Sequence, residues 1–182
     1  MKNNKNKNKN KIESYLWELA FEGNMEGVQK MLQKEEIDIN WAEEKFQRTP
    51  LFVACFYGRV DIVKLLLQDP RIDPNLSAKD GITPFIITCQ KGNLEIFEIL
   101  LTHELVDINK PASNGLTPLF ALLNVVQLEL FKILFTSKKI INTKAIFQGQ
   151  TVIEKATLLG DVEISNLILN YESNCKNSLL FL

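Results

Sequence analysis

Residues 49–67 read TPLFVACFYGRVDIVKLLL, and this stretch decides the fold because its framework recurs along the chain. The pair Thr49-Pro50 returns at intervals of 34 residues as Thr83-Pro84 and Thr117-Pro118, and with Val in place of Pro as Thr151-Val152. A second marker keeps the same interval at Gly58, Gly92, Val126 and Gly160, with Gly23 lying 35 residues before Gly58. Several matches at one interval indicate an internal repeat, which is typical of a stacked array of small structural units.

Each repeat contains the signals for two short helices. Thr is a preferred N-cap residue and Pro fits the first helical position, so Thr-Pro predicts the start of a helix. The following apolar stretch ends at a Gly, which favours the left-handed conformation that closes a helix. A second helix then begins with an acid in its first turn, at Glu26, Asp61, Glu95, Glu129 and Glu163. Its apolar residues recur at helical spacing, as in Ile62, Val63, Leu66 and Leu67.

The connectors that follow each second helix are rich in Asp, Pro, Asn, Ser and Gly. A common motif runs through them as Asp38-Ile39-Asn40, Asp73-Pro74-Asn75, Asp107-Ile108-Asn109 and a weaker Ile141-Asn142. The turn pairs Asp80-Gly81 and Asn114-Gly115 come shortly before the next Thr-Pro. These pairs predict extended, hairpin-like loops between successive units.

This order of motifs resembles the ankyrin repeat over residues 12–172. The tetratricopeptide, another helical repeat of similar length, requires a Trp-x-x-Leu-Gly-x-x-Tyr signature that the chain lacks. The resemblance implies an all-α repeat solenoid of five stacked ankyrin-type helix-turn-helix units joined by β-hairpin-like loops. We predict a disordered Lys/Asn-rich tail over 1–11, an ankyrin repeat domain over 12–172, and a C-terminal tail over 173–182. The expected units span about 12–40, 41–75, 76–109, 110–142 and 143–172.

Some positions depart from the family pattern. The His that usually follows Thr-Pro-Leu is replaced at the equivalent positions by Trp17, Phe52, Ile86, Phe120 and Glu154, so we expect apolar packing there in place of a polar bridge. Val126 stands where the family has Gly, which predicts a local distortion of the fourth unit. The two end units carry polar residues at otherwise apolar positions, as repeats that cap an array do: Lys30 in the first, and Glu154, Lys155, Thr157, Ser165 and Asn166 in the last.

The charge of the chain is unevenly distributed. The formal net charge is −1, but five lysines lie before residue 12, and without them 16 basic residues face 22 acidic ones. An acidic body disfavours nucleic-acid binding. No apolar run approaches the roughly 20 residues of a membrane helix, and the Lys/Asn tail does not resemble a secretory signal. We expect a protein of the cytoplasm or nucleus that does not bind membranes.

The sequence offers no catalytic, cofactor or metal site, so we predict that the chain is not an enzyme and needs no cofactor. His103 is the single histidine and lies near a predicted helix C-terminus, where a capping role is favoured. Cys55 and Cys89 occupy equivalent positions in successive repeats, which predicts that both are small core residues. Cys175 lies in the predicted tail.

The family resemblance implies a protein-binding scaffold or adaptor, monomeric by itself and without a small-molecule substrate. Its partner would contact the hairpin tips and the concave face of the first helices. The equivalent positions here are Phe21, Glu22, Phe46, Arg48, Phe56, Tyr57, Lys79, Asp80, Ile82, Gln90, Lys91, Ser113, Asn114, Leu116 and Asn124.

Phe46, Arg48, Phe56 and Tyr57 should form one cluster on that surface, since exposed aromatic residues and Arg are typical of binding hot spots. Two alternatives stay open. Phe56 and Tyr57 could instead pack against the neighbouring repeat. The chain could also be a regulatory or targeting subunit of an enzyme or channel whose catalytic part lies on another chain.

Overall fold

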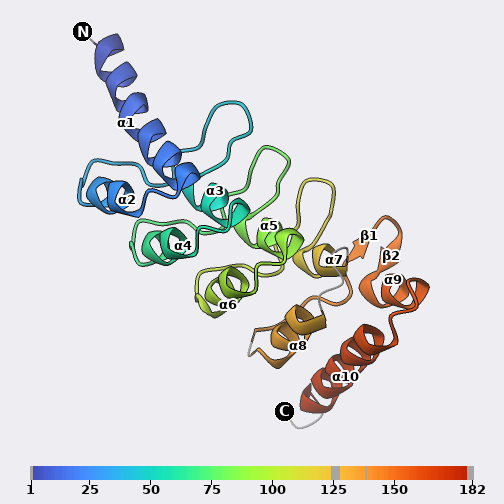
Figure 1. Ribbon diagram of the computed structural model, residues 1–182. Coiled ribbons are helices and arrows are strands. Elements are labelled where there is room, and N and C mark those ends of the chain that lie inside the picture. The colour runs from blue at the N-terminus through green and yellow to red at the C-terminus, as the bar shows by residue number, and fades with distance from the viewer. Residues whose placement is uncertain (1, 124–127, 138, 180–182) are drawn as a thin grey trace.

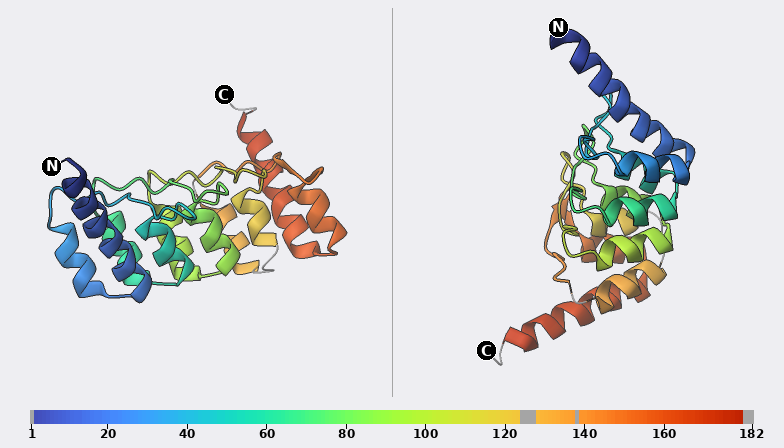
Figure 2. Two further views of the ribbon diagram at one scale, coloured as in Figure 1. Left: turned by 90° about the horizontal axis from the view of Figure 1, so that it is seen from above. Right: turned by 90° about the vertical axis from the view of Figure 1, so that its left-hand side faces the viewer.

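The computed structural model describes residues 2–123, 128–137 and 139–179, which form two parallel rows of helices (Figure 1). The first helices of the units make one row: α1 (Lys2–Glu22), α3 (Pro50–Phe56), α5 (Pro84–Lys91), α7 (Pro118–Leu123) and α9 (Val152–Leu158). The second helices make the other: α2 (Met25–Leu32), α4 (Val60–Leu67), α6 (Leu94–Thr102), α8 (Leu128–Thr136) and α10 (Val162–Leu179). The two further views show the same stacking, so the fold is the predicted all-α repeat solenoid (Figure 2).

The helix boundaries follow the predicted capping chemistry. The hydroxyl of Thr49 accepts a hydrogen bond from the Phe52 N–H at 3.2 Å, and that of Thr83 accepts one from the Ile86 N–H at 3.1 Å. Gly92 ends α5 with a φ of 68°, in the left-handed conformation. The Thr-Pro and Gly markers therefore do define the first helices.

The core is continuous along the array because each helix packs on its equivalent in the next unit. The row α1, α3, α5, α7 is in contact throughout, and so is the row α2, α4, α6, α8. Ile62, Val63 and Leu66 of α4 are at most 2% exposed, which confirms the predicted apolar face. Phe52, Ile86 and Phe120, at the positions where the family has His, are at most 4% exposed and pack as apolar residues. Glu154 differs, since it forms a capping box with Thr151 at the start of α9.

The recurring connector Asn is a bridge between units. The amide nitrogen of Asn75 donates to the Leu105 carbonyl at 2.7 Å, and its amide oxygen accepts from the Asp107 N–H at 2.8 Å. Asn40 and Asn109 make the same pair of contacts with the connectors that follow them. This geometry explains why the Asp-x-Asn motif keeps the period of the helices.

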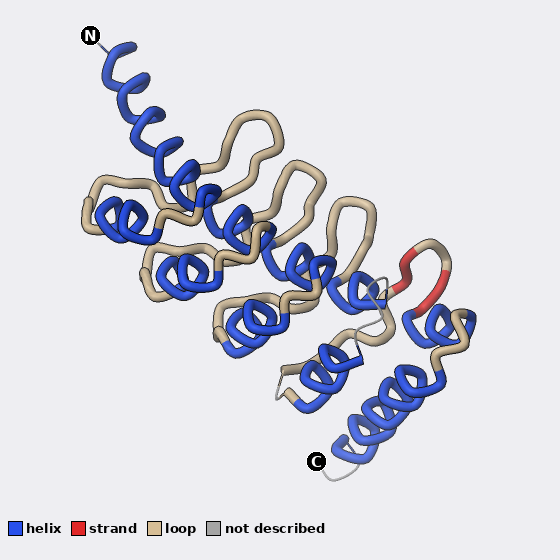
Figure 3. Tube along the Cα trace, in the orientation of Figure 1, coloured by secondary structure: helices blue, strands red, loops and turns tan. Residues whose placement is uncertain are grey.

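The hairpin-like loops lie side by side on the edge of the first-helix row (Figure 3). The N–H of Lys79 donates to the Phe46 carbonyl at 2.8 Å, and the N–H of Ser113 donates to the Asp80 carbonyl at 3.0 Å. Within the described residues, β-strands form at the last loop, where β1 (Ile146–Phe147) pairs antiparallel with β2 (Gln150–Thr151). Each loop tip is thus fixed by hydrogen bonds to the tip beside it or within its own hairpin.

The two ends of the chain differ from the sequence prediction. Residues 2–11 were expected to be a disordered tail, but α1 is helical from Lys2, and α10 continues to Leu179 through most of the expected C-terminal tail. Once packed residues such as Leu16 have nucleated a helix, each further turn adds hydrogen bonds without a new nucleation cost. The distortion predicted at Val126 and the last residues of the chain lie outside the described residues. None of the described helices is both long and apolar enough to span a bilayer.

The close approach of neighbouring loop tips predicts a strong effect at Gly81. This residue has a φ of 82°, and a Cβ atom added there would lie 2.3 Å from the Ser113 backbone nitrogen. The left-handed backbone costs an alanine about 1 kcal/mol, and the clash adds roughly 1–3 kcal/mol. We expect Gly81→Ala to lower the free energy of unfolding by that combined amount in urea titrations.

Gly149→Ala is the matched control for this measurement. Gly149 has a φ of 76°, and an added Cβ atom would meet nothing within 4 Å. This variant should lose only the backbone contribution of about 1 kcal/mol. Equal losses in the two variants would contradict the close packing of the loop tips.

The Asn bridge predicts a second effect on stability. Asn75→Ala removes both side-chain hydrogen bonds to the next connector, so we expect it to lower the free energy of unfolding by about 1–3 kcal/mol. Asn170→Ala is the control, because Asn170 is exposed and makes no side-chain hydrogen bond within the described residues. A loss at Asn75 no larger than at Asn170 would show that the bridges do not hold the units together.

Candidate partner-binding surface

Aromatic rings from neighbouring units meet at the ends of α1 and α3. The Phe21 and Tyr57 rings are in edge contact, with their centroids 4.8 Å apart, and the Phe56 and Tyr57 centroids are 4.9 Å apart. Phe21 stands just before Gly23, and Phe56 and Tyr57 stand just before Gly58, so the stacking of the first helices places equivalent positions side by side. The rings thus form one contiguous group across two units.

Two cations are packed against this group. The Arg48 guanidinium carbon lies 4.7 Å from the Phe46 ring centroid, 5.5 Å from that of Phe52 and 5.7 Å from that of Phe56. The Lys91 ammonium lies 3.9 Å from the Phe56 centroid. All four distances fall within the range of favourable cation–π contacts. We call the set Phe21, Phe46, Arg48, Phe56, Tyr57 and Lys91 the aromatic–cation surface.

The aromatic–cation surface is partly supported by the core and partly open to solvent. Phe21, Phe46 and Tyr57 are 41%, 43% and 47% exposed, whereas Phe56 is half-buried against the core. The structure therefore brings together the four residues predicted to cluster. It also shows that Phe56 packs on its neighbours, as the alternative held, while Tyr57 stays exposed.

A hollow of about 260 Å³ lies beside the aromatic–cation surface, between the first two loop tips. Its lining consists of Phe46, Arg48, Ala78, Lys79 and Asp80. The Asp80 carboxylate accepts a hydrogen bond from the Ile82 N–H at 3.2 Å, which holds the second loop in its turn. The hollow thus offers two basic side chains, one carboxylate and one apolar wall to a ligand.

The other predicted contact positions have mixed exposure. Six are exposed: Glu22, Lys79, Asp80, Lys91, Ser113 and Asn114. Gln90 and Ile82 are half-buried. Leu116 is only 6% exposed, so little of its side chain is open to a partner. It lies directly before Thr117 on the inner side of its loop and packs into the core. Asn124 lies outside the described residues.

Two contacts of the aromatic–cation surface were missed in the sequence. Trp17 stacks on Phe21 with a centroid distance of 5.7 Å and an interplanar angle of 6°. The Lys45 ammonium lies 4.9 Å from the Phe46 ring centroid. The i, i+4 spacing of Trp17 and Phe21 on one helix was the available signal for the first contact.

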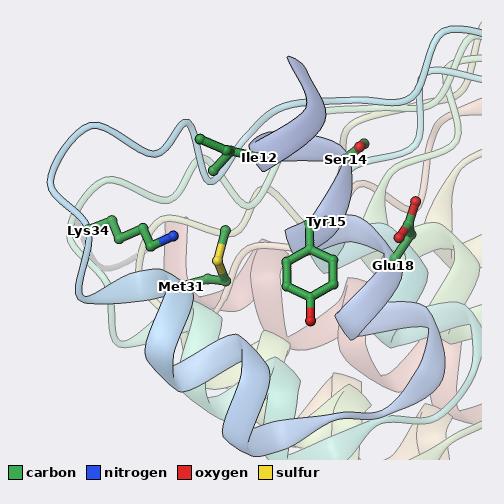
Figure 4. A pocket seen from close by; sticks show the side chains of 6 residues that line it. All are labelled: Ile12, Ser14, Tyr15, Glu18, Met31 and Lys34. Atoms are coloured by element: carbon green, nitrogen blue, oxygen red, sulfur yellow. The ribbon is translucent and has the colours of Figure 1, made fainter. Parts of the chain in front are cut away.

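A second hollow of about 330 Å³ lies between α1 and α2 (Figure 4). It is lined by Ile12, Ser14, Tyr15, Glu18, Met31 and Lys34. Tyr15 is its one aromatic residue and is 50% exposed. Its ring and its exposed fraction match those of Tyr57, so substitutions in this hollow can serve as controls for substitutions in the aromatic–cation surface.

Cys55, Cys89 and His103, whose side chains could react, have structural roles. Burial raises the pKa of the Cys55 thiol to about 12 and also raises the pKa of Cys89, so both are poor nucleophiles. His103 is the C-cap of α6, and its carbonyl accepts a hydrogen bond from the Lys139 ammonium at 2.7 Å. Among the described residues, no three His, Cys, Asp or Glu side chains lie close enough to hold a metal ion.

Comparison with protein families identifies the repeat. A family model described as ankyrin repeats (3 copies) matches residues 1–78 and 70–145. The two matched segments overlap and together cover most of the chain. A comparison with curated proteins gives no match.

Proposed function

Because this chain belongs to the ankyrin repeat family, we propose that it is a non-catalytic scaffold or adaptor that binds a protein partner through the aromatic–cation surface. Ankyrin repeats are generally protein–protein interaction modules. In this proposal, the partner contacts the hairpin tips and the ends of the first helices. The observation that supports this location is the grouping of three half-exposed rings and two cations at the junction of α1, α3 and the first loop.

The composition of the aromatic–cation surface is that of a binding hot spot. Tyr and Arg are enriched among the residues whose truncation costs most binding energy, and hot spots gather in contiguous, well-packed patches. Tyr57 is held on two sides by the Phe21 and Phe56 rings, so little side-chain entropy is lost when a partner covers it. The surface is therefore pre-organised before a partner arrives.

The proposed absence of catalysis is supported by the roles of the reactive residue types. The buried thiols of Cys55 and Cys89 are protonated at neutral pH, and His103 caps a helix. All three cysteines are free thiols, and we propose a reducing compartment, the cytoplasm or the nucleus, as the site of action.

A pull-down from cell extract tests the binding proposal. The double variant Arg48→Ala, Tyr57→Ala removes the central cation and the most exposed ring of the surface. We expect it to recover at least about tenfold less of the partner than the wild-type chain, as is usual when hot-spot residues are truncated. Circular dichroism should show that the variant remains folded.

The matched control is the double variant Tyr15→Ala, Lys34→Ala. It removes a ring as exposed as that of Tyr57, together with an exposed cation, from the hollow between α1 and α2. This control should recover the partner as well as the wild-type chain does. Unchanged recovery by the Arg48 and Tyr57 variant, or an equal loss in both variants, would refute the proposed location.

A further inference from the structure

We propose that the segment bound at the aromatic–cation surface is an acidic peptide. Its Asp or Glu carboxylates would pair with Arg48, Lys79 and Lys91, while an apolar side chain beside them would cover Tyr57. This inference rests on the proposed function and adds the chemistry of the partner. It follows from the cations at this surface and from their lack of hydrogen-bond or ion-pair acceptors within the described chain.

Arg48 is distinguished from the other two arginines by its missing acceptors. The Arg71 guanidinium donates to the Asp69 carboxylate at 2.6 Å and to the backbone carbonyls of Leu32, Lys34 and Glu35. Arg59 donates to the Phe21 carbonyl at 3.2 Å. In the part of the chain that the structure describes, the Arg48 side chain donates no hydrogen bond, and its Nε is buried without a partner. Arg48 is only half-buried and lines the hollow, so the rest of its guanidinium can meet a ligand that brings an acceptor.

Most of the lysines that lack an acceptor lie around Arg48. Between residues 12 and 175, leaving out 124–127 and 138, the lysine side chains without a hydrogen bond or ion pair are Lys34, Lys45, Lys79, Lys91 and Lys155. Lys45 lies over the Phe46 ring, Lys79 lines the hollow with Arg48, and Lys91 lies over the Phe56 ring. Most of the uncompensated positive charge of the described body is therefore at one place.

The acids of the same loops form no ion pair with these cations. The Glu43 carboxylate accepts hydrogen bonds from the backbone N–H groups of Lys45 and Phe46, each at 2.8 Å. The Asp80 carboxylate is held by the Ile82 N–H. Glu44 forms no ion pair with any described cation. The carboxylates that would complete the surface must come from the partner.

The rings around Arg48 strengthen such a pair. The Phe46, Phe52 and Phe56 rings lie against the half-buried guanidinium, and an ion pair with less competing water is stronger than a fully exposed surface pair. The planar guanidinium also matches the two oxygens of a carboxylate. Elsewhere the body carries an excess of acid, which repels an acidic segment and so favours this one position.

Selection of peptides from an unbiased library tests the inference. A displayed library of random peptides about twelve residues long is selected on the immobilised full-length chain, and the composition of the selected peptides is compared with that of the starting library. We expect Asp and Glu to be enriched beside an apolar residue. Affinity of a synthesised, selected peptide should fall at least about tenfold for Arg48→Gln and for Lys91→Gln, and it should weaken with added salt.

Three variants act as controls. Lys34→Gln and Lys155→Gln remove lysines that also lack an acceptor but lie away from the aromatic–cation surface, so they should leave the affinity unchanged. Arg48→Lys keeps the charge and loses the planar donor pair, so its affinity should lie between those of the wild type and Arg48→Gln. Lys91 is exposed, and its replacement does not endanger the fold.

The outcomes separate the inference from the proposed function. Selected peptides that lose affinity with Tyr57→Ala but are not enriched in acids would overturn the acidic partner and leave the binding surface in place. Peptides insensitive to Arg48, Tyr57 and Lys91, or no selected peptides at all, would overturn both. Binding of an oligothymidylate to the chain is measured as well. If the oligothymidylate binds, if Arg48→Gln abolishes this binding and if no acidic peptides are selected, the acidic-peptide inference is overturned in favour of a nucleic acid.

Discussion

No helix pair of this chain can bury its apolar residues alone, and the rest of the structure depends on that constraint. In α4, Ile62 and Leu66 are buried because α2 and α6 lie on either side of it. The short helices are too small to be stable in isolation, so their order comes from stacking on equivalent helices. The asparagine bridges and the hydrogen bonds between loop tips repeat at the same interval and fix the spacing that stacking sets.

The same stacking creates the candidate binding surface. Since each first helix ends at an equivalent place, the residues just before each closing glycine lie next to one another in space. In the first two units these residues are Phe21, Phe56 and Tyr57, and in the third they include Lys91. The loop before α3 adds Phe46 and Arg48. A binding surface formed in this way is rigid, because every residue in it is attached to a packed helix or to a hydrogen-bonded loop tip.

The parts of the fold set by local chemistry could be predicted from the sequence. Thr83 before Pro84 and Gly92 after α5 define a helix through their own backbone requirements, and the spacing of Ile62 to Leu67 defines a buried face. The cluster of Phe46, Arg48, Phe56 and Tyr57 could be predicted from positions equivalent in the family.

Other features depend on contacts between units that no single segment specifies. The edge contact of Phe21 with Tyr57 joins residues of two units, and the burial of Leu116 depends on which side of its loop faces the core. The length of α1 is another example, because the weak helix signal of its Lys/Asn-rich start is overridden by the packed turns that follow it. The missing acceptors of Arg48 also emerge only when all its neighbours are in place.

Amide hydrogen exchange of the chain, alone and in complex with the protein that it recovers from cell extract, tests the central claim most directly. If the partner covers the aromatic–cation surface, exchange should slow in residues 45–48, 56–58 and 79–81 upon binding. Slowing confined to the connectors that follow the second helices, such as residues 33–38 and 68–72, would place the partner on the other side of the array and contradict the claim.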